Sequence, residues 1–206
     1  MYTPPPFRID DPDTLHRFIR AHSFATLMTP SDEGLQITHL PLLIEPEAGP
    51  HGTLRGHFAK ANPHAQRIST GAPTTAIFHG PHAYVSPHDY SGQTPAVPTW
   101  NYAVVHAHGT LNALADDSEL TQHLAEIVET YETGSPNPWA YDADSDLNRG
   151  LLRAIVGFEL PIQHFEGKFK LGQNRSAEDQ SAMLEALQQG SVEGQALAEF
   201  IQKFNG

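Results

Sequence analysis

YAVVHAHGTLNAL, residues 102–114, is the stretch that decides the class of fold. Val104, His106 and His108 alternate in it with Val105 and Ala107, and a period of two places the first three side chains on one face of a strand. We therefore predict a long strand here.

Several further runs predict strands, because apolar and β-branched residues are bounded in each by turn-forming residues. The predicted strands are FATLM (24–28), ITHLPLLIE (37–45), TLRGHFA (53–59), TTAIFHG (74–80), AYVS (83–86) and IVGFELPIQHFEGKFKL (155–171). The turn at Pro30–Gly34 suggests that the first two form a hairpin.

Helices are predicted mostly near the chain ends, with one in the middle, from helical spacing of apolar residues and from capping residues. The predicted caps are Asp11 before Pro12, Asn62 before Pro63, Asp117 or Ser118, a start near Ser145, and Ser176 with Asp179. In the middle helix the apolar stripe is Leu120, Leu124, Ile127, Val128 and Tyr131.

Strands in succession, without regular alternation with helices, disfavour a doubly wound parallel sheet. We predict a mainly β fold with peripheral helices (α+β), built on an antiparallel barrel. The main domain is expected over residues 1–175 and a helical extension over 176–206.

The composition excludes several classes of protein. Among 206 residues there is no cysteine, which excludes disulfides, thiolate metal sites and a cysteine nucleophile. No apolar run approaches the roughly 20 residues that span a bilayer, and the start MYTPPPFRID lacks a signal sequence. We expect a soluble, cytoplasmic protein.

The charge is strongly acidic, with 12 Lys and Arg against 24 Asp and Glu. No Lys or Arg occurs between Arg67 and Arg149. The predicted helix over 118–133 carries four glutamates, so it is unsuited to a DNA groove. A long nucleic-acid track is therefore disfavoured, although a small anion remains compatible with the local cations.

The segment LRGHFAKANPH (54–64) combines cations with a helix start. Arg55, His57 and Lys60 lie near a strand end, and free backbone N–H groups at a helix start bind phosphate. The alternative is a solvated strand edge followed by an ordinary cap at Asn62.

Two other segments are candidates for ligand contacts. VPTWNYAVVHAHG (97–109) places Trp100, Asn101 and Tyr102 side by side, which suits a planar heterocycle or an aromatic core. FEGKFKLGQNR (165–175) is dense in hydrogen-bond donors and suits an anion or an ordinary charged loop. Its donors are Lys168, Lys170, Gln173, Asn174 and Arg175.

The 13 histidines raise the question of a metal site. His106 and His108 share a strand face, and His79 and His82 are the other candidates. Because there is no HExxH motif and no carboxylate at a supporting spacing, we predict no metal. No GxSxG, P-loop or GxGxxG motif is present either.

Six blocks, in this order, resemble the PaiB family of FMN-binding negative transcriptional regulators. They are THLPLLIE (38–45), GTLRGHFAKANP (52–63), AYVSP (83–87), VPTWNY (97–102), LLRAIVGFELPI (151–162) and EGKFKLGQNR (166–175). The resemblance implies a six-stranded antiparallel split barrel of the FMN-binding type, and a homodimer with FMN near the subunit interface.

The resemblance also implies which residues contact FMN. Thr38, His39 and Leu40 would lie along the isoalloxazine ring. Closer to the phosphate and ribityl chain would be Arg55, Gly56, His57, Lys60 and Asn62. Trp100 and Asn101 would close one side, and Lys168, Gln173 and Arg175 would reach in, from the same subunit or its partner.

The sequence departs from the family pattern at three places. His88-Asp89-Tyr90 stands where Ser-Trp-Tyr is usual, and the following stretch is shortened to SGQTPA (91–96). Phe169 stands where a tryptophan is expected, and Gly172 where a serine is expected.

Three classes of function remain open at this point. The first is an FMN-binding repressor, for which the family implies DNA contact and the acidic charge opposes it. The second is an enzyme, a flavin reductase or oxidase, with His57 and His106 as the only candidate acid–base groups and with haem binding as a related alternative. The third is an interaction module without a cofactor.

Overall fold

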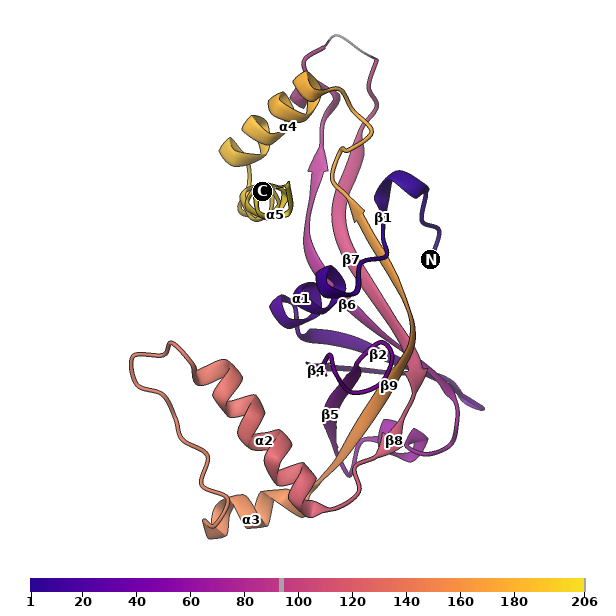
Figure 1. Cartoon of the computed structure of the whole chain (residues 1–206), viewed down its shortest axis with the longest axis vertical. Coiled ribbons are helices and arrows are strands. Elements are labelled where there is room, and N and C mark those ends of the chain that lie inside the picture. The colour runs from indigo at the N-terminus through magenta and orange to yellow at the C-terminus, as the bar shows by residue number, and fades with distance from the viewer. Residues whose placement is uncertain (93–94, 206) are drawn as a thin grey trace. The chain divides into compact units, whose positions relative to one another are not determined.

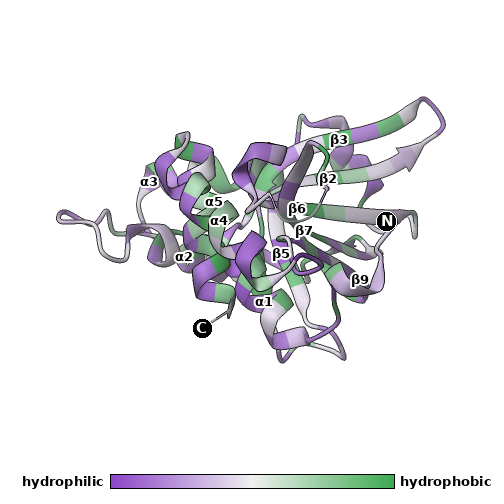
Figure 2. Ribbon diagram, turned by 90° about the horizontal axis from the view of Figure 1, so that it is seen from above, coloured by the Kyte–Doolittle hydropathy of each residue, from purple (hydrophilic) through white to green (hydrophobic). Residues whose placement is uncertain are grey.

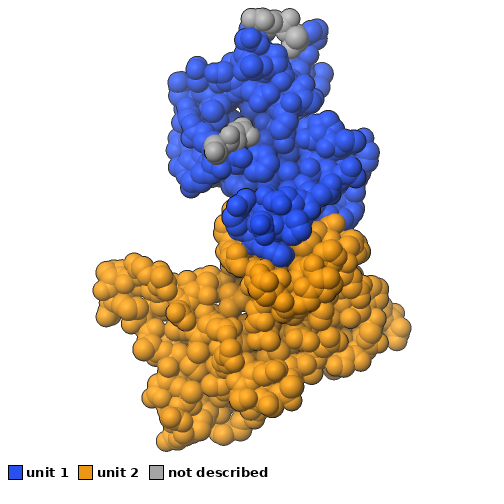
Figure 3. Space-filling model, in the orientation of Figure 1, with its two compact units in different colours: residues 1–18, 78–106, 166–206 blue, residues 19–77, 107–165 orange. Residues whose placement is uncertain are grey.

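The computed structural model describes residues 1–92 and 95–205, and its contacts divide the chain into two compact units (Figure 3). Unit 1 comprises residues 1–18, 78–106 and 166–206, and unit 2 comprises residues 19–77 and 107–165. Gln93 and Thr94, in the shortened SGQTPA stretch, lie outside the described residues. The predicted division into residues 1–175 and 176–206 stays a prediction.

The strands form a single sheet in the described part of the chain (Figure 1). Its order is β3-β2-β6-β7-β9-β5-β4, with two short strands, β1 and β8, paired to β9. The bounds are β1 (Arg8–Ile9), β2 (Phe24–Ser31), β3 (Gly34–Pro41), β4 (Leu43–Glu45), β5 (Thr53–Ala59), β6 (Pro73–Val85), β7 (Thr99–Thr110), β8 (Asn112–Ala113) and β9 (Ile155–Lys170). The predicted class, an antiparallel sheet with peripheral helices, is confirmed, with nine strands in the sheet rather than six.

The predicted hairpin is present as β2 and β3, which pair antiparallel from Phe24 opposite Pro41 to Ser31 opposite Gly34. Gly34 has a φ of 118°, which suits glycine and closes the turn. Hydrophilic and hydrophobic residues alternate along this hairpin (Figure 2). Buried and more exposed positions also alternate along β2, so one face of the hairpin is buried, while Leu35 and Ile37 of β3 lie on the face that is open to solvent.

The predicted strand 37–45 is broken in two. Pro41 has no N–H to donate, and β3 ends there, while the Leu42 N–H bonds to the Ser23 carbonyl. The chain then changes partner, since β4 pairs with β5 instead of β2. Conversely, the two predicted strands 74–80 and 83–86 are one strand, β6.

The helices lie near most of their predicted positions. They are α1 (Pro12–Ala21), α2 (Asp117–Glu132), α3 (Asp146–Leu152), α4 (Ala177–Gln189) and α5 (Val192–Asn205), with short 3-10 helices η1 (Pro5–Phe7), η2 (Pro63–Arg67) and η3 (Pro87–Asp89). None of the helices in the described residues has the length and apolar character needed to cross a membrane.

The residues that cap these helices agree with the predictions except at two positions. Ser145 and Ser176 cap α3 and α4 as predicted. The cap of α2 is Asp116, one residue earlier than predicted, and its carboxylate accepts the Ser118 and Glu119 N–H groups. Asp179 does not complete a capping box with Ser176, because its carboxylate accepts hydrogen bonds from Ser91.

Unit 1 is held together by an aromatic core. Phe169 of β9 is 1% exposed, and its ring centroid lies 5.0 Å from that of Phe18, 5.4 Å from Phe200 and 5.3 Å from Phe204. The Phe18 ring also covers Gly80 of β6, where a Cβ atom would lie 2.7 Å from it. These contacts hold α1 and α5 against the part of the sheet that belongs to unit 1.

Candidate functional site

Strand β5 in unit 2 presents two predicted cofactor-binding side chains on one face. Arg55 and His57 alternate with Gly56 and Phe58, so the two pairs point to opposite sides. Phe58 is buried, and a Cβ atom at Gly56 would lie 2.6 Å from Leu42. Gly56 therefore serves core packing, while Arg55 and His57 form the start of a polar cluster.

Only some of the hydrogen-bond donors of the Arg55 guanidinium have a partner in this cluster. Its Nη1 atom lies 2.8 Å from Oε1 of Glu45 on β4, and its side chain is 18% exposed. The Nε atom is buried without a hydrogen-bond partner in the described structure. A buried donor left unpaired costs about 1–3 kcal/mol, so this guanidinium retains capacity for an acceptor.

His123 of α2 also belongs to this polar cluster. Its side chain is 0% exposed, and neither ring nitrogen has a hydrogen-bond partner among the described residues. Its ring lies against that of His57, with centroids 5.7 Å apart. Burial lowers the pKa of His123 to about 4, with smaller contributions from His57 and Arg55.

His57 is also shifted, since burial lowers its pKa. Both imidazoles are therefore neutral at pH 7, and each offers one N–H donor. With the Arg55 guanidinium they make a set of donors that suits an anion. Lys60, at the end of the same segment, is exposed and adds a positive charge.

Asn62 and Thr38 have structural partners in unit 2. The Asn62 side chain accepts the His64 N–H at the start of η2, and its Nδ2 donates to the Thr38 hydroxyl 3.1 Å away. Thr38 also bonds His64 Nδ1 at 2.9 Å. The predicted cap at Asn62 is confirmed, although the helix is a short 3-10 helix and one of its free N–H groups is already used.

The hydrogen-bond chain continues into the core. His64 Nε2 lies 2.9 Å from the Thr29 hydroxyl, which lies 2.7 Å from that of Thr74. His64 is 1% exposed, and burial lowers its pKa. This chain joins β3, η2, β2 and β6 and fixes the position of the segment that carries Lys60.

The other two predicted contacts of β3 point in different directions. Leu40 is buried in the core of unit 2. His39 is exposed on the opposite face, where its Nδ1 lies 3.0 Å from the Thr26 hydroxyl. Thr38, His39 and Leu40 therefore do not line one surface together, because successive residues of a strand alternate.

In unit 1, Trp100 and Asn101 also occupy opposite faces of their strand, β7. Trp100 is 55% exposed, and its ring lies 6.1 Å from that of His82 and 6.3 Å from that of Tyr84. Asn101 is 1% exposed and donates from Nδ2 to the sulfur of Met183 at 3.1 Å. Only Trp100 is available to a ligand in this arrangement.

The predicted donors near the end of β9 have partners within unit 1. Lys168 is 8% exposed and donates to the Tyr2 carbonyl, with its Nζ 5.2 Å from the Tyr102 ring centroid. Gln173 accepts from the Leu171 N–H and donates to the Phe169 carbonyl.

Arg175 and Lys170 are held in the same way. The Arg175 guanidinium lies 4.6 Å from the Tyr90 ring centroid, and Lys170 donates to Thr99 and to the Trp100 carbonyl. Burial lowers the pKa of Lys170, and the positive charges of Lys168 and Arg175 add to this effect. These cations organise the loops around them.

Two departures from the family pattern have a structural explanation. Gly172 has a φ of 89°, a backbone conformation that favours glycine over serine. Phe169 fills the aromatic core of unit 1 and does not reach a surface. At the third departure, Asp89 accepts the Ser86 N–H and closes η3, and Tyr90 packs under Arg175.

The strand histidines have separate contacts in the two units. In unit 1, His106 Nδ1 lies 3.5 Å from Oε2 of Glu166. In unit 2, His108 stacks on His164, with centroids 4.3 Å apart, and its Nδ1 lies 3.0 Å from the Thr75 hydroxyl. Whether any of these histidines binds a metal or haem stays a prediction.

The structure adds three residues that sequence reasoning did not select. They are Glu45, His64 and His123. His123 follows Leu120 by three residues, and this spacing places both on one helix face, so a stricter reading of periodicity would have found it. The pairing of Glu45 with Arg55 depends on the β4–β5 register, which no local signal predicts.

The antiparallel sheet with its peripheral helices has the fold of flavin-binding split-barrel proteins. Solved structures with the same fold include the FAD and heme binding protein from Mycobacterium smegmatis (TM-score 0.62, 15% identity, 85% of this chain and 78% of that one). The flavocytochrome Anf3 from Azotobacter vinelandii is similar as well (TM-score 0.63, 13% identity, 85% of this chain and 75% of that one).

The chain belongs to the family described as "Putative FMN-binding domain", whose model matches residues 1–164. It is 36% identical over 190 residues to the protease synthase and sporulation protein PAI 2 of Bacillus subtilis, covering 91% of this chain and 89% of that protein. An uncharacterised protein of Aspergillus fumigatus is 29% identical, with 92% of each chain covered. The family resemblance predicted from the sequence is confirmed, and FMN is the cofactor that this family assigns to the domain.

The residues of unit 2 fit the phosphate of FMN. Arg55 retains an unpartnered buried N–H, and His57 and Lys60 lie on the same short segment. A phosphate dianion would satisfy donors that the protein leaves unpaired. The thirteen predicted contacts are divided, eight in unit 2 and five in unit 1, and the assignment of each to FMN stays a prediction.

Proposed function

We propose that this protein binds FMN with its phosphate on the β5 segment of unit 2, and that it acts as a flavin-dependent negative regulator. Family membership supports the cofactor. The single observation that carries the placement is the buried, unpartnered Nε of Arg55 beside the His57–His123 pair. Bound FMN would supply reversible hydride and electron chemistry.

In this proposal each residue of the segment has a distinct task. Arg55 supplies a charge-assisted hydrogen bond to the phosphate, and Glu45 holds the guanidinium in place. His57 donates from a neutral ring, and Lys60 adds a positive charge at the exposed end of the segment. The network of Thr38, Asn62 and His64 keeps this segment rigid, so that little conformational entropy is lost on binding.

Comparison of FMN with riboflavin tests this placement, because the two differ only in the phosphate. We expect FMN to bind at least about tenfold more tightly, measured by quenching of flavin fluorescence. A visible spectrum of the purified protein shows whether flavin is retained. Equal affinities for the two flavins would place the phosphate away from Arg55, and failure to bind either would reject the cofactor for this chain.

The regulatory role is supported by the family resemblance and by the relative in Bacillus subtilis, whose name connects it with protease synthesis and sporulation. We propose that regulation runs through a protein partner, because a formal net charge of −12 opposes unaided binding to DNA. A mobility-shift assay at graded salt tests this point. A shift at 150 mM salt that weakens steeply as salt rises would show direct DNA binding instead.

We also propose that two copies associate through the outer face of the β2–β3 hairpin. Phe24, Leu35 and Ile37 are 67%, 54% and 53% exposed on this face. Leu35 and Ile37 are neighbours on this face, and Phe24 lies beyond the Thr26–His39 pair. Exposed apolar side chains grouped on one face are typical of interaction surfaces. Light scattering coupled to size-exclusion chromatography tests the expected dimer, and a monomer at micromolar concentration would contradict it.

A flavin reductase is the second candidate function. The observation that favours it is His57, which is neutral at neutral pH and can therefore accept a proton as well as donate one. NAD(P)H consumption in the presence of FMN tests this candidate. Turnover that falls strongly in a His57→Gln variant would favour the enzyme over the regulator.

A further inference from the structure

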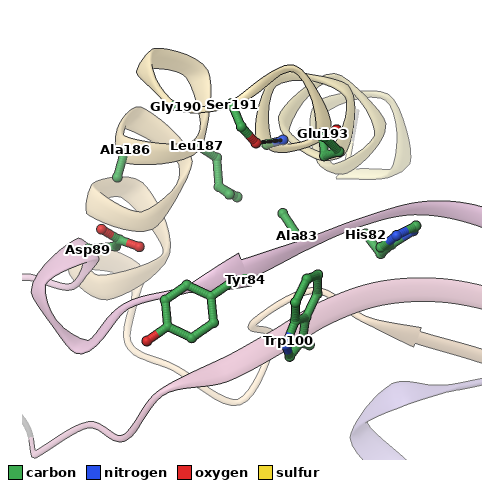
Figure 4. A pocket seen from close by; sticks show the side chains of 11 residues that line it. His82, Ala83, Tyr84, Asp89, Trp100, Ala186, Leu187, Gly190, Ser191 and Glu193 are labelled. Atoms are coloured by element: carbon green, nitrogen blue, oxygen red, sulfur yellow. Dashed lines mark hydrogen bonds between the residues drawn. The ribbon is translucent and has the colours of Figure 1, made fainter.

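Unit 1 carries a groove that the proposed phosphate cluster of unit 2 does not use (Figure 4). A hollow of about 490 Å³ is bordered by β6 and β7 on one side and by the turn between α4 and α5 on the other. A second hollow of about 370 Å³ lies along the same two strands. Trp100 and His82 line both hollows, so the two are adjacent and form one extended groove.

The floor of the groove is aromatic. Trp100 is 55% exposed and Tyr84 is 51% exposed, and their rings meet edge to face at 71°. The Trp100 backbone is fixed by the hydrogen bond from Lys170 to its carbonyl, and the next residue, Asn101, is anchored in the core. The indole therefore stands in a defined position with much of its surface open to a ligand.

The charged groups that line the groove are acidic. Hydrogen bonds from its own N–H and from Ser191 lower the pKa of Glu193, and His82 lowers it further, so the Glu193 carboxylate is ionised. Asp89 of η3 supplies a second carboxylate. None of the described residues lining either hollow is Lys or Arg. The two carboxylates favour a cation in the first hollow. Lys170 at the Trp100 carbonyl and Lys168 at the Tyr102 ring already have partners in unit 1.

We propose that this groove binds an arginine-bearing, extended segment of a basic partner protein. A guanidinium is planar, so it can lie on the face of Trp100 or Tyr84 while it donates hydrogen bonds to Glu193. Trp100 lines both hollows, so an extended chain can follow the groove past the indole. The net charge of −12 adds long-range attraction for a basic partner.

This site is distinct from the FMN phosphate cluster, whose residues all belong to unit 2. The proposed ligands differ as well. The carboxylates and exposed aromatic rings of the groove favour a cation, whereas the cluster in unit 2 favours a phosphate. Trp100 is also one of the predicted FMN contacts, so variants of Glu193, which leave Trp100 in place, are needed to separate the two proposals. A basic protein is the kind of partner through which an acidic regulator can act without touching DNA.

The fluorescence of Trp100 gives a direct readout. The chain has two tryptophans, and Trp139→Phe leaves Trp100 as the only one. The probe is the peptide acetyl-Gly-Arg-Gly-Arg-Gly-Arg-Gly-amide, compared with the same peptide carrying citrulline and with acetyl-arginine amide. We expect saturable binding of the arginine peptide, about tenfold weaker binding of the citrulline peptide, and weaker binding of the single arginine.

The Glu193→Gln variant tests the acidic wall, and Glu199→Gln, on the exposed side of the same helix, is the matched control. We expect Glu193→Gln to weaken binding of the arginine peptide about threefold, and Glu199→Gln to leave the affinity for this peptide unchanged. FMN affinity should be the same in both variants, which separates this proposal from the proposed function.

Three results would overturn the proposal. The first is equal binding of the arginine and citrulline peptides, or no saturable binding of either. The second is equal binding of acetyl-arginine amide and the peptide, which would indicate a site for a small cation. The third is conversion of a dimer to a monomer by Glu193→Gln or Trp100→Ala in light scattering, which would show that a second copy of this chain occupies the groove.

Discussion

The imidazole of His123 on α2 lies against that of His57 on β5, with ring centroids 5.7 Å apart and ring planes inclined at 72°. His123 is 0% exposed, and neither of its nitrogens has a hydrogen-bond partner in the described structure. A protonated His123 would be a buried charge beside Arg55, without an acceptor. The pair is therefore stable only while His123 is neutral.

The first prediction concerns acid stability. The pKa of His123 is lowered from 6.5 to about 4 in the folded protein, so the unfolded chain binds the proton more readily between these values. The free energy of unfolding is therefore highest above pH 6.5 and falls as the pH is lowered towards 4. The expected loss from this residue is about 3 kcal/mol.

Urea unfolding at several pH values from 7.5 to 4 measures this loss. Carboxylates contribute below pH 5, so the informative quantity is the difference between the wild type and His123→Leu, which cannot titrate at this position. We expect the variant to lose less stability over this range. If the free energy of unfolding depended on pH equally in the two proteins, His123 would not be the group that causes the loss of stability.

The second prediction concerns the FMN phosphate. Arg55→Ala should weaken FMN binding by about 1.5–3 kcal/mol, because it removes a charge-assisted hydrogen bond. Riboflavin, which has no phosphate, should be affected much less. Fluorescence titration with both flavins separates loss of the phosphate contact from general damage to the site.

Arg8→Ala is the matched control for this variant, since Arg8 pairs with Asp10 on the surface of unit 1. It should leave both affinities unchanged. An Arg55→Ala protein that binds FMN as tightly as the wild type would remove Arg55 from the cofactor site. Equal losses for FMN and riboflavin would instead indicate a structural role.

The third prediction concerns the proposed dimer. Ile37→Glu places a charge on the outer face of the β2–β3 hairpin, where Ile37 stands opposite Met28. A buried, unpaired carboxylate is costly in an interface, whereas the isolated subunit keeps this position in water. Light scattering should show a monomer whose circular dichroism spectrum is unchanged. A dimer that persists would mean that another surface joins the subunits.

Local signals predicted much of this fold. The alternation over residues 102–110, the turn before Gly34 and the caps at Asn62, Ser145 and Ser176 all depend on neighbouring residues, and all are present. The break at Leu42 was missed, because the change of strand partner there is decided by pairing between distant segments.

The candidate site was harder to predict for the same reason. Arg55 and His57 are visible in the sequence, but their partners Glu45 and His123 come from a neighbouring strand and from a helix much later in the chain. On α2, the expected stripe is only half-buried at Leu124 and exposed at Tyr131, and the fully buried polar residue is His123. Burial of a polar residue depends on tertiary packing, which periodicity alone does not report.

The fourth prediction contrasts two neighbours on β7. Trp100 is 55% exposed and Asn101 is 1% exposed, so their side chains contribute to different properties although they are adjacent in sequence. Trp100→Ala should change the free energy of unfolding by about 1 kcal/mol or less, since more than half of the residue is exposed in the folded protein. Asn101→Ala should lower it by about 1–3 kcal/mol, because it removes a buried hydrogen bond to Met183 and leaves a void. Chemical denaturation of both variants measures these two changes. A large loss of stability in Trp100→Ala would show that the indole supports the core. Its exposed ring could then no longer be assigned to a ligand.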